Sequence, residues 1–435
     1  MKTTLGNLVR DGSADYQTGP FGTMLKASEY SSEGSPLISV GEIREGFFTI
    51  HDHTPRVCEK IKLKLPQFVL EEGDIVFGRK GAINRNAIIR KSQAGWFLGS
   101  DGIRLRLTDK HDPGFFSYFL RTTMIGRWLL SNGQGAIMPS LNQKILDRLP
   151  LFLPSKSEQQ RISGVLSALD AKIELNNRIN EELEGMAKLL YDYWFVQFDF
   201  PITAAQAAAM GKPHLKGKPY RASGGKMIYN EALKREIPEG WMPGNLEKLG
   251  KIVGGSTPNT KKTEYFCKVG TPWITPKDLS DNSGNRFIDR GSMCVTSEGI
   301  KAASLKLLPA GTVLMSSRAP IGYLAIARNP VTTNQGFKSF VPEKAFSGDY
   351  IYSTLKHFMK LIKANASGST FKEISGGTLK AVRIHLPPVD LVAEFTERVS
   401  SLSLQQSLLE QQNQQLTGLR DWLLPMLMNG QVTVG

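Results

Sequence analysis

Residues 135–190 read GAIMPSLNQKILDRLPLFLPSKSEQQRISGVLSALDAKIELNNRINEELEGMAKLL, and residues 368–423 repeat this stretch without a gap. Eleven of the 56 aligned positions are identical, whereas ordinary composition would give about three or four by chance. The chain therefore contains two copies of one module. The identical pairs are Gly135/Gly368, Leu146/Leu379, Leu153/Leu386, Pro154/Pro387, Ser167/Ser400, Leu169/Leu402, Leu175/Leu408, Asn180/Asn413, Leu183/Leu416, Gly185/Gly418 and Leu190/Leu423.

Each copy ends in a long helix with a coiled-coil seam. In the first copy, Ser155 and Glu158 have capping-box spacing directly after Pro154 and predict where the helix begins. Seam residues then recur at alternating steps of four and three. They are Ile162, Leu166, Leu169, Ile173, Asn176, Asn180, Leu183, Ala187, Leu190 and Trp194, and in the second copy Phe395, Val399, Leu402, Gln406, Leu409, Asn413, Leu416, Arg420, Leu423 and Leu427.

A single helix with such a stripe needs a partner, and each copy supplies one for the other. About 40 residues at 1.5 Å each give a helix of roughly 60 Å. The polar seam residues Asn176, Asn180, Gln406 and Asn413 are predicted to fix register and pairing at some cost in stability. The alternative is that they are solvent-facing ends of a short bundle.

Two globular segments precede the helices. In residues 1–154, strand-like runs occur at 74–77, 86–90 and 102–107, a helix is expected at 113–130, and LPLFLP at 149–154 indicates a buried strand. In residues 241–388, strands are expected at 311–315, 323–327 and 337–341, and a helix at 349–366.

The sequence thus predicts an α+β protein with a pseudo-twofold repeat: two mixed α/β domains and two long coiled-coil helices. The domains are residues 1–154 and 241–388, and the helical regions are residues 155–200 and 389–435. Residues 201–240, rich in Gly, Pro, Ala and Lys, are expected to be a basic linker.

Charge is distributed unevenly. The whole chain carries a net charge of +14, yet each helical region is acidic. The basic charge therefore lies outside the repeated helices, which favours contact with a polyanion such as nucleic acid over an inert basic surface. The first residues, MKTTLGNLVRDG, lack an apolar signal core, and Cys58, Cys267 and Cys294 have no paired spacing; both features favour a cytoplasmic location.

Signatures of catalysis are missing from the sequence. Gly225 and Lys226 come nearest to a phosphate-binding loop, but Met227 follows where a hydroxyl belongs. No Asn-Pro-Pro-aromatic tetrapeptide for amino-group methylation occurs, and the six histidines have no ligand spacing for a metal. The expectation is therefore recognition rather than catalysis, with no cofactor and no metal bound by this chain.

Loops in both globular segments are candidates for DNA contact. GRKGAINR at 78–85 sets cations among glycines, and SSRAPIG at 316–322 corresponds to it. LGSDGIRLR at 98–106 is matched by TNQGFKS at 333–339, so that Asp101 corresponds to Gln335 and Arg104 to Lys338. The candidate DNA-binding residues are Arg79, Lys80, Arg85, Asp101 and Arg104 in the first half, and Arg318, Asn334, Gln335 and Lys338 in the second.

The second half also contains GGSTPNTKK at 254–262 and PWITPKDL at 272–279. Hydroxyls and lysines in such loops suit phosphate positioning, which adds Ser256, Thr257, Lys261, Lys262 and Lys277 to the candidates. For any one of these residues, a solvated turn is an equally good interpretation.

The chain resembles the specificity subunit of a type I restriction–modification enzyme. The resemblance covers essentially the whole chain and rests on GGSTP with PWITPKDL, GTVLMSSRAPIG at 311–322, TNQGFKSF at 333–340, the approach from Gly368 to Pro387, and the stretch at 217–241. The first half departs from the pattern, because it opens with ADYQTGPFG at 14–22 instead of a GGSTP-like sequence.

The resemblance implies a non-catalytic subunit with two target-recognition domains, each reading one half of a split DNA sequence. It implies that the two helices pair antiparallel, set the unread gap and dock two methyltransferase (modification) subunits, which bring S-adenosylmethionine. A motor–nuclease (restriction) subunit would use ATP and Mg. Helix pairing and partner docking would fall to Leu169, Asn180, Leu183, Leu190, Leu402, Asn413, Leu416 and Leu423.

Two alternatives remain open. A free-standing regulator could use the two domains to grip a split DNA operator without a methyltransferase partner. An enzyme such as a nuclease could have an active site of a kind that the sequence does not reveal.

Overall fold

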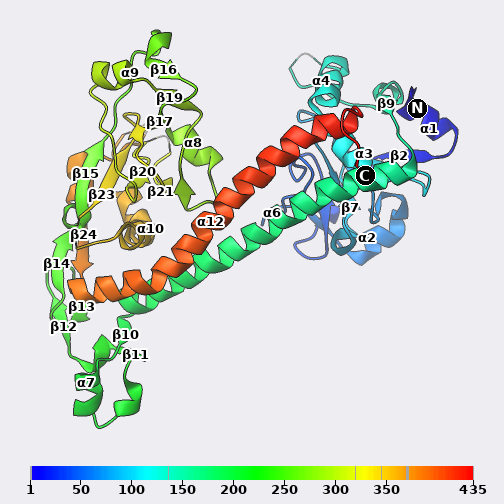
Figure 1. Cartoon of the computed structure of the whole chain (residues 1–435). Coiled ribbons are helices and arrows are strands. Elements are labelled where there is room, and N and C mark those ends of the chain that lie inside the picture. Colours follow the sequence, from blue (N-terminus) through cyan, green and yellow to red (C-terminus); the bar gives the residue numbers. More distant parts are fainter. Residues whose placement is uncertain (1, 136, 319, 344, 369–371, 435) are drawn as a thin grey trace. The chain divides into compact units, whose positions relative to one another are not determined.

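A computed structural model describes residues 2–135, 137–318, 320–343, 345–368 and 372–434 (Figure 1). The chain divides into two compact units. Unit 1 comprises Met1–Glu174 with Gln414–Gly435, and unit 2 comprises Leu175–Asn413. Residues 136 and 369–371 of the repeated stretches, and residue 319 of the 316–322 loop, lie outside the described residues.

Unit 1 contains a four-stranded antiparallel sheet in the order β2-β8-β5-β6 and a three-stranded sheet in the order β4-β3-β7, in which β3 and β7 are parallel. An outer pair, β1 and β9, leads into the long helix. The strands are β1 (Lys2–Thr4), β2 (Ala14–Thr18), β3 (Ser35–Ile38), β4 (Arg56–Val57), β5 (Ile75–Gly78), β6 (Asn86–Ile88), β7 (Phe97–Leu98), β8 (Gly102–Leu107) and β9 (Pro150–Phe152).

The shorter helices of unit 1 are α1 (Leu5–Arg10), α2 (Glu59–Lys64), α3 (Pro113–Leu120), α4 (Thr123–Asn132) and α5 (Gln143–Asp147). Four of these helices pack in one core with the larger sheet, and α2 packs in a second core with the smaller sheet. The prediction of a single helix at 113–130 is wrong, because the chain turns at Arg121 and a second helix, α4, begins at Thr123. The Thr122 hydroxyl caps α4, accepting from the Ile125 amide at 3.5 Å.

Unit 2 has a similar arrangement, with one more strand in each sheet. A five-stranded sheet follows the order β15-β23-β20-β21-β18, a four-stranded sheet follows β16-β19-β17-β22, and β14 pairs with β24. The strands are β14 (Met242–Asn245), β15 (Gly250–Gly254), β16 (Phe266–Cys267), β17 (Thr271–Ile274), β18 (Phe287–Ile288), β19 (Met293–Val295), β20 (Val313–Met315), β21 (Leu324–Ala327), β22 (Thr332–Thr333), β23 (Lys338–Pro342) and β24 (Arg383–Leu386).

The two units therefore share a common set of strands, to which unit 2 adds β16 and β18 at sheet edges. In pairing partners and direction, β2, β8, β5 and β6 correspond to β15, β23, β20 and β21, and the parallel pair β3·β7 corresponds to β17·β22. The shorter helices of the recognition fold in unit 2 are α8 (Pro276–Asp281), α9 (Ser297–Ala302), α10 (Gly348–Ala364) and α11 (Gly376–Lys380). The internal repeat predicted from the helices thus extends through both recognition folds.

Residues 201–240, expected to be a linker, contain regular structure of their own. They hold α7 (Ala204–Ala209) and the strands β10 (Asp199–Pro201), β11 (Pro219–Arg221), β12 (Met227–Asn230) and β13 (Arg235–Pro238), which form two antiparallel hairpin pairs. The side chains of Ile202, Ala207 and Ile237 are buried. The strand pairing and these buried side chains give the segment a folded structure, although its sequence is polar and rich in glycine.

The long helices are α6 (Lys156–Tyr191) and α12 (Val389–Met428). The predicted capping box is present: the Ser155 amide donates to Glu158 Oε2 at 3.0 Å, and the Glu158 amide donates to Ser155 Oγ at 3.4 Å. None of the twenty predicted seam residues is exposed. The 3.5-residue periodicity therefore identified the covered face of both helices.

The helices pair antiparallel within each unit (Figure 1). In unit 1, Ile162 shares a core with Leu427, and Asp170 Oδ1 accepts from Arg420 Nη1 at 2.9 Å. In unit 2, Asn176 Nδ2 donates to Asn413 Oδ1 at 2.8 Å. As residue numbers rise along α6, those of its partners on α12 fall, which defines the direction. Among the described residues, no helix is long and apolar enough to cross a membrane.

Candidate nucleic-acid interface

Three loops of unit 2 meet at one end of its large sheet. The loop after β15 contacts the loop before β23, because the Thr257 hydroxyl donates to Gln335 Oε1 and the Ser256 amide donates to the Thr333 carbonyl at 3.0 Å. The loop between β20 and β21 joins them through the Ser317 amide, which donates to the Gly336 carbonyl at 2.8 Å. The structure therefore brings together candidates that lie about 80 residues apart in sequence: Ser256, Thr257, Arg318, Asn334 and Gln335.

The lysine candidates of unit 2 lie around these loops with different partners. Lys262 Nζ donates to the Tyr265 hydroxyl at 3.3 Å, and Lys277 pairs with Asp281 at 2.7 Å on the surface of α8. The Lys261 amide donates to Asn259 Oδ1 at 3.0 Å. Lys338 lies in β23 opposite Gly254. All four remain at least partly accessible, so their charges can still act on a polyanion.

The equivalent loops of unit 1 carry the other cations. The Arg79 amide donates to the Asp101 carbonyl at 2.8 Å, and Arg79 Nη1 donates to the Ser100 carbonyl at 3.2 Å. The Arg79 guanidinium also lies 5.1 Å from the ring centre of Phe21. Lys80 Nζ is 3.3 Å from Asp101 Oδ1, and Arg85, half-buried, closes the same loop before β6. Asp101 thus neutralises part of this basic loop.

The structure corrects the correspondence between the halves by one residue. Arg79 and Ser317 make the same backbone hydrogen bond, to Asp101 and Gly336 respectively. Lys80 therefore corresponds to Arg318, and Asp101 corresponds to Gly336 rather than to Gln335. The same shift holds on both sides of the loop, because Leu98 corresponds to Thr333 in the parallel strand pairs and Gly102 corresponds to Phe337 in the large sheets.

Arg104 is not brought to the interface. Because successive strand residues point to opposite faces, the shift of one residue makes Arg104 equivalent to Ser339 and not to Lys338. Its side chain is 7% exposed and pairs with Asp15. Burial lowers the pKa of Arg104, and the nearby Arg106 lowers it further. Arg104 therefore stabilises the sheet of unit 1 in this structure.

Beside each of these loops, two residues are joined by a pair of backbone hydrogen bonds that the sequence did not predict. In unit 1, Gln134 and Ser140 exchange backbone hydrogen bonds of 3.0 and 2.7 Å. In unit 2, Ser367 and Glu373 exchange bonds of 3.0 and 2.9 Å. The signal was available, since Gly135/Gly368 is the first identical pair of the repeat and both glycines have positive φ.

The seam holds the polar residues that were expected to set register. Asn176 is fully buried, and its Nδ2 donates to Gln412 Oε1 and Asn413 Oδ1, both at 2.8 Å. Asn413 in turn donates to Asn177 Oδ1 at 2.7 Å. Asn180 and Gln406 are also buried, which argues against solvent-facing ends. The seam leucines Leu169, Leu183, Leu190, Leu402, Leu416 and Leu423 are buried or half-buried.

Outward faces of the helices carry exposed apolar side chains at matching positions. With the 233-residue offset, Leu175 corresponds to Leu408, Met186 to Leu419, and Leu189 to Trp422, and all six are more than 40% exposed. An exposed apolar residue alone means little. Three pairs at equivalent positions of a repeat are a pattern that singly scattered apolar residues would not produce.

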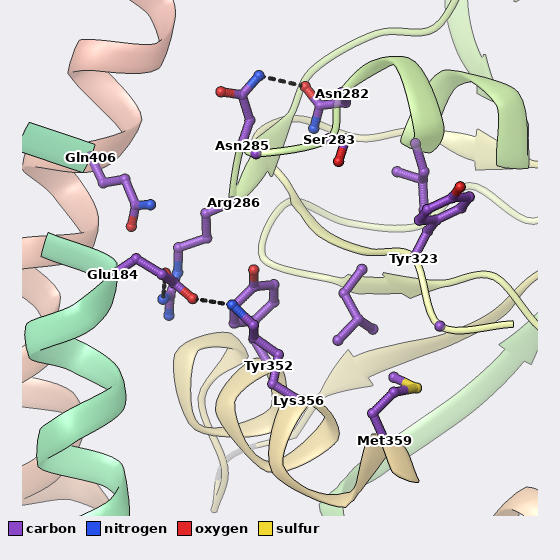
Figure 2. A pocket seen from close by; sticks show the side chains of 14 residues that line it. Glu184, Asn282, Ser283, Asn285, Arg286, Tyr323, Tyr352, Lys356, Met359 and Gln406 are labelled. Carbon is purple, nitrogen blue, oxygen red and sulfur yellow. Dashed lines mark hydrogen bonds and ion pairs between the residues drawn. The ribbon is translucent and has the colours of Figure 1, made fainter. Parts of the chain in front are cut away.

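A buried ionic cluster in unit 2 fixes the recognition fold on the helices (Figure 2). The Arg286 guanidinium is 2.9 Å from Glu184 of α6 and 2.7 Å from Asp349 of α10. Glu410 of α12 accepts from the amides of Arg286 and Phe287 and pairs with Arg328 at 2.6 Å. Burial raises the pKa of Glu410 to about 7, although these donors lower it.

The pocket in Figure 2 lies beside this cluster and is lined by Glu184, Arg286, Tyr352 and Lys356. Glu184 accepts from both Arg286 and Lys356, at 2.9 and 2.6 Å, so its charge is satisfied within the protein. Within the described part of the chain, no group of three or more His, Cys, Asp or Glu side chains could hold a metal ion.

Comparisons with known proteins agree with the duplicated architecture. A family model described as type I restriction modification DNA specificity domain matches residues 21–185 and again 238–417. The MjaIX specificity subunit of a type I restriction enzyme from Methanocaldococcus jannaschii is 44% identical over 154 residues, which cover 35% of this chain and 35% of that relative. The HindI specificity subunit from Haemophilus influenzae is 28% identical over 344 residues, 70% of this chain and 73% of that relative.

The fold has also been seen in a solved structure. The S subunit of a type I restriction–modification system from M. genitalium superposes with a TM-score of 0.59 at 15% identity, covering 98% of this chain and 96% of that one. At this identity the match shows a shared fold with two recognition domains and long helices.

Proposed function

Because this chain belongs to the family of type I restriction modification DNA specificity domains, we propose that it is the DNA sequence-specificity subunit of a type I restriction–modification complex. Each recognition domain reads one half of a bipartite DNA target, and the chain itself carries out no chemistry. The observation that supports this most is the duplication: both halves match the family model, and both bring the same loops to the same end of the same sheet.

The domains in this proposal follow the sequence. Residues 1–154 and 241–388 are the two target-recognition domains, residues 155–200 and 389–435 are the spacer helices, and residues 201–240 connect the halves. The basic charge outside the helices attracts the phosphate backbone, while the loops supply base contacts. The proposal places this activity in the cytoplasm.

The proposed DNA contacts are the candidate residues in and around these loops that the structure leaves accessible. Cations supply phosphate contacts or bidentate contacts to guanine, and the amides of Asn334 and Gln335 suit adenine. Arg104 is omitted because it is buried and paired. The residues proposed are Arg79, Lys80, Arg85, Asp101, Ser256, Thr257, Lys261, Lys262, Lys277, Arg318, Asn334, Gln335 and Lys338.

The helices serve two further roles in the proposal. Their pairing through Asn176 and Asn413 sets the unread gap between the half-sites, and their exposed apolar pairs dock two modification subunits. These partners supply S-adenosylmethionine, and restriction subunits with ATP and Mg complete the complex. A free-standing regulator would not need the matched pairs Met186/Leu419 and Leu189/Trp422 on its surface.

Long-read mapping of adenine methylation tests the proposal. Cells that carry the candidate modification subunit are compared with and without this chain. A gapped, bipartite motif that is methylated only when the chain is present is the expected result. If no such motif appears while both proteins are soluble and associated, the regulator becomes the better explanation.

A domain exchange sharpens the same experiment. Residues 1–154 are replaced by the corresponding domain of another specificity subunit, and the motif is mapped again. One half of the motif should change while the other half and the gap stay the same. A change in both halves, or in neither, contradicts separate reading by the two domains.

A further inference from the structure

A hairpin of residues 134, 135 and 137–140 stands beside the basic loop of unit 1, and residue 136 lies outside the described residues. The hairpin follows α4 and is closed by the two backbone hydrogen bonds between Gln134 and Ser140. Gly135 turns the chain with a φ of 101°, and an added Cβ there would lie 2.6 Å from the Met138 carbonyl oxygen. A side chain at this position would therefore open the turn.

The hairpin is attached directly to the basic loop of unit 1. The Leu141 amide donates to the Arg79 carbonyl at 2.8 Å, and the Gly81 amide donates to the Pro139 carbonyl at 2.8 Å. Lys80 and Ser140 form an antiparallel bridge between these bonds. The hairpin tip is thus held beside Arg79 and Lys80, two of the proposed DNA contacts.

The tip of this hairpin is apolar. Ile137 is 100% exposed and Met138 is 60% exposed, so the folded chain leaves the first uncovered and the second mostly uncovered. A scattered exposed apolar residue would need no explanation. Here two adjacent ones lie on a hairpin that is bonded to a cationic loop, and unit 2 repeats the attachment, with the Ile374 amide donating to the Ser317 carbonyl at 3.0 Å.

DNA offers apolar surface of the kind that such a tip could cover. Thymine presents a C5-methyl group in the major groove, and apolar side chains can wedge between base steps where a protein bends the duplex. The adjacent cations would hold the phosphates while the tip reaches the bases. A tip without charge or hydrogen-bonding groups gains nothing from the phosphates themselves.

We propose that Ile137 and Met138 make an apolar contact with the bases of the half-site that is read by residues 1–154. This inference rests on the proposed function and adds a specificity-determining element that is not one of the basic loops. It makes sequence discrimination in one half-site depend on apolar side chains.

The test uses a double variant, Ile137→Ser together with Met138→Ser, in the full-length chain with its modification subunits. It is compared with the unaltered complex. Binding is measured by fluorescence anisotropy on the mapped target, on targets altered in one half-site, and across a salt series. The control variant is Leu63→Ser, which removes a 78% exposed leucine from α2 in the same unit.

We expect the double variant to bind the mapped target at least tenfold more weakly. It should also lose discrimination against targets altered in the half-site read by residues 1–154, and keep discrimination in the other half-site. The dependence of affinity on salt should not change, because an apolar tip releases no counterions. Lys80→Ala, by contrast, should lower the salt slope. If the double variant binds and discriminates like Leu63→Ser, the inference is wrong.

Modified bases locate the contact. Replacing thymine by deoxyuracil removes only the methyl group, and a loss seen with the unaltered chain but not with the variant supports a methyl contact. A rise in 2-aminopurine fluorescence that depends on Ile137 and Met138 supports insertion at a base step. If the unaltered complex shows no preference for any mapped target, the proposed function fails instead, which distinguishes the two failures.

Discussion

Arg318 and Lys80 occupy equivalent positions in the two halves, but their surroundings differ. Lys80 pairs with Asp101 at 3.3 Å. Asp101 has Gly336 as its equivalent, and among the described residues Arg318 forms no ion pair. A guanidinium without a partner, placed beside the amides of Asn334 and Gln335, can make two hydrogen bonds to guanine.

Arg318→Ala should therefore reduce discrimination in the half-site read by residues 241–388 by about tenfold to a hundredfold, corresponding to about 1–3 kcal/mol. Competition binding with targets altered in each half measures this. Lys301→Ala, which removes an exposed cation from α9, serves as the control for lost charge. Equal losses with both variants would mean that Arg318 contributes only to the overall charge.

The sequence could predict where a residue lies only where a periodic pattern specified one face of a helix or strand. The seam residues were identified because a heptad repeat specifies one helix face. Arg104 was matched to the wrong residue because the sequence comparison set Gly102 opposite Gly336, whereas Gly102 corresponds to Phe337, and a shift of one residue reverses the strand face. The sequence could not reveal this shift, because the two loops share too few identities to fix their alignment.

At the scale of elements, the long helices have two different faces. One face pairs through the seam, as the sequence predicted. The other bears the exposed pairs Met186/Leu419 and Leu189/Trp422, which a search for buried stripes does not reveal. The sequence also merged α3 and α4, because the apolar spacing of α3 continues past the turn at Arg121 and Thr122.

The outward face allows a prediction about stoichiometry. Trp422→Ser should remove one of two modification subunits, and Leu189→Ser combined with Trp422→Ser should remove both, since the two residues are equivalent in the repeat. Native mass spectrometry of the purified complex counts the subunits, with Leu63→Ser as the control. Loss of both subunits from the single variant, or of neither from the double variant, contradicts two equivalent docking sites.

At the scale of the whole molecule, the proposed spacer function depends on helix length. Four residues inserted into each long helix, after Glu174 and after Asn413, add about 6 Å of helix. At about 3.4 Å per base pair, the gap in the methylated motif should grow by about two base pairs. Methylation mapping reads the gap directly.

The control for this prediction is the same insertion after Gly211, in an exposed turn between α7 and β11. It should leave the gap as it is. An unchanged gap after both helix insertions, with methylation retained, would show that the helices do not determine the spacing.

Unit 1 is built from both ends of the chain, since Leu427 and Met428 lie in the same core as Leu5 and Phe116. Domains usually fold in the order in which the ribosome makes them. Here the first recognition fold emerges early but waits for the final turns of α12, whereas unit 2, residues 175–413, is complete before them. The half that is synthesised first is therefore the half that finishes last, and a chain cut short near its end loses packing at its beginning.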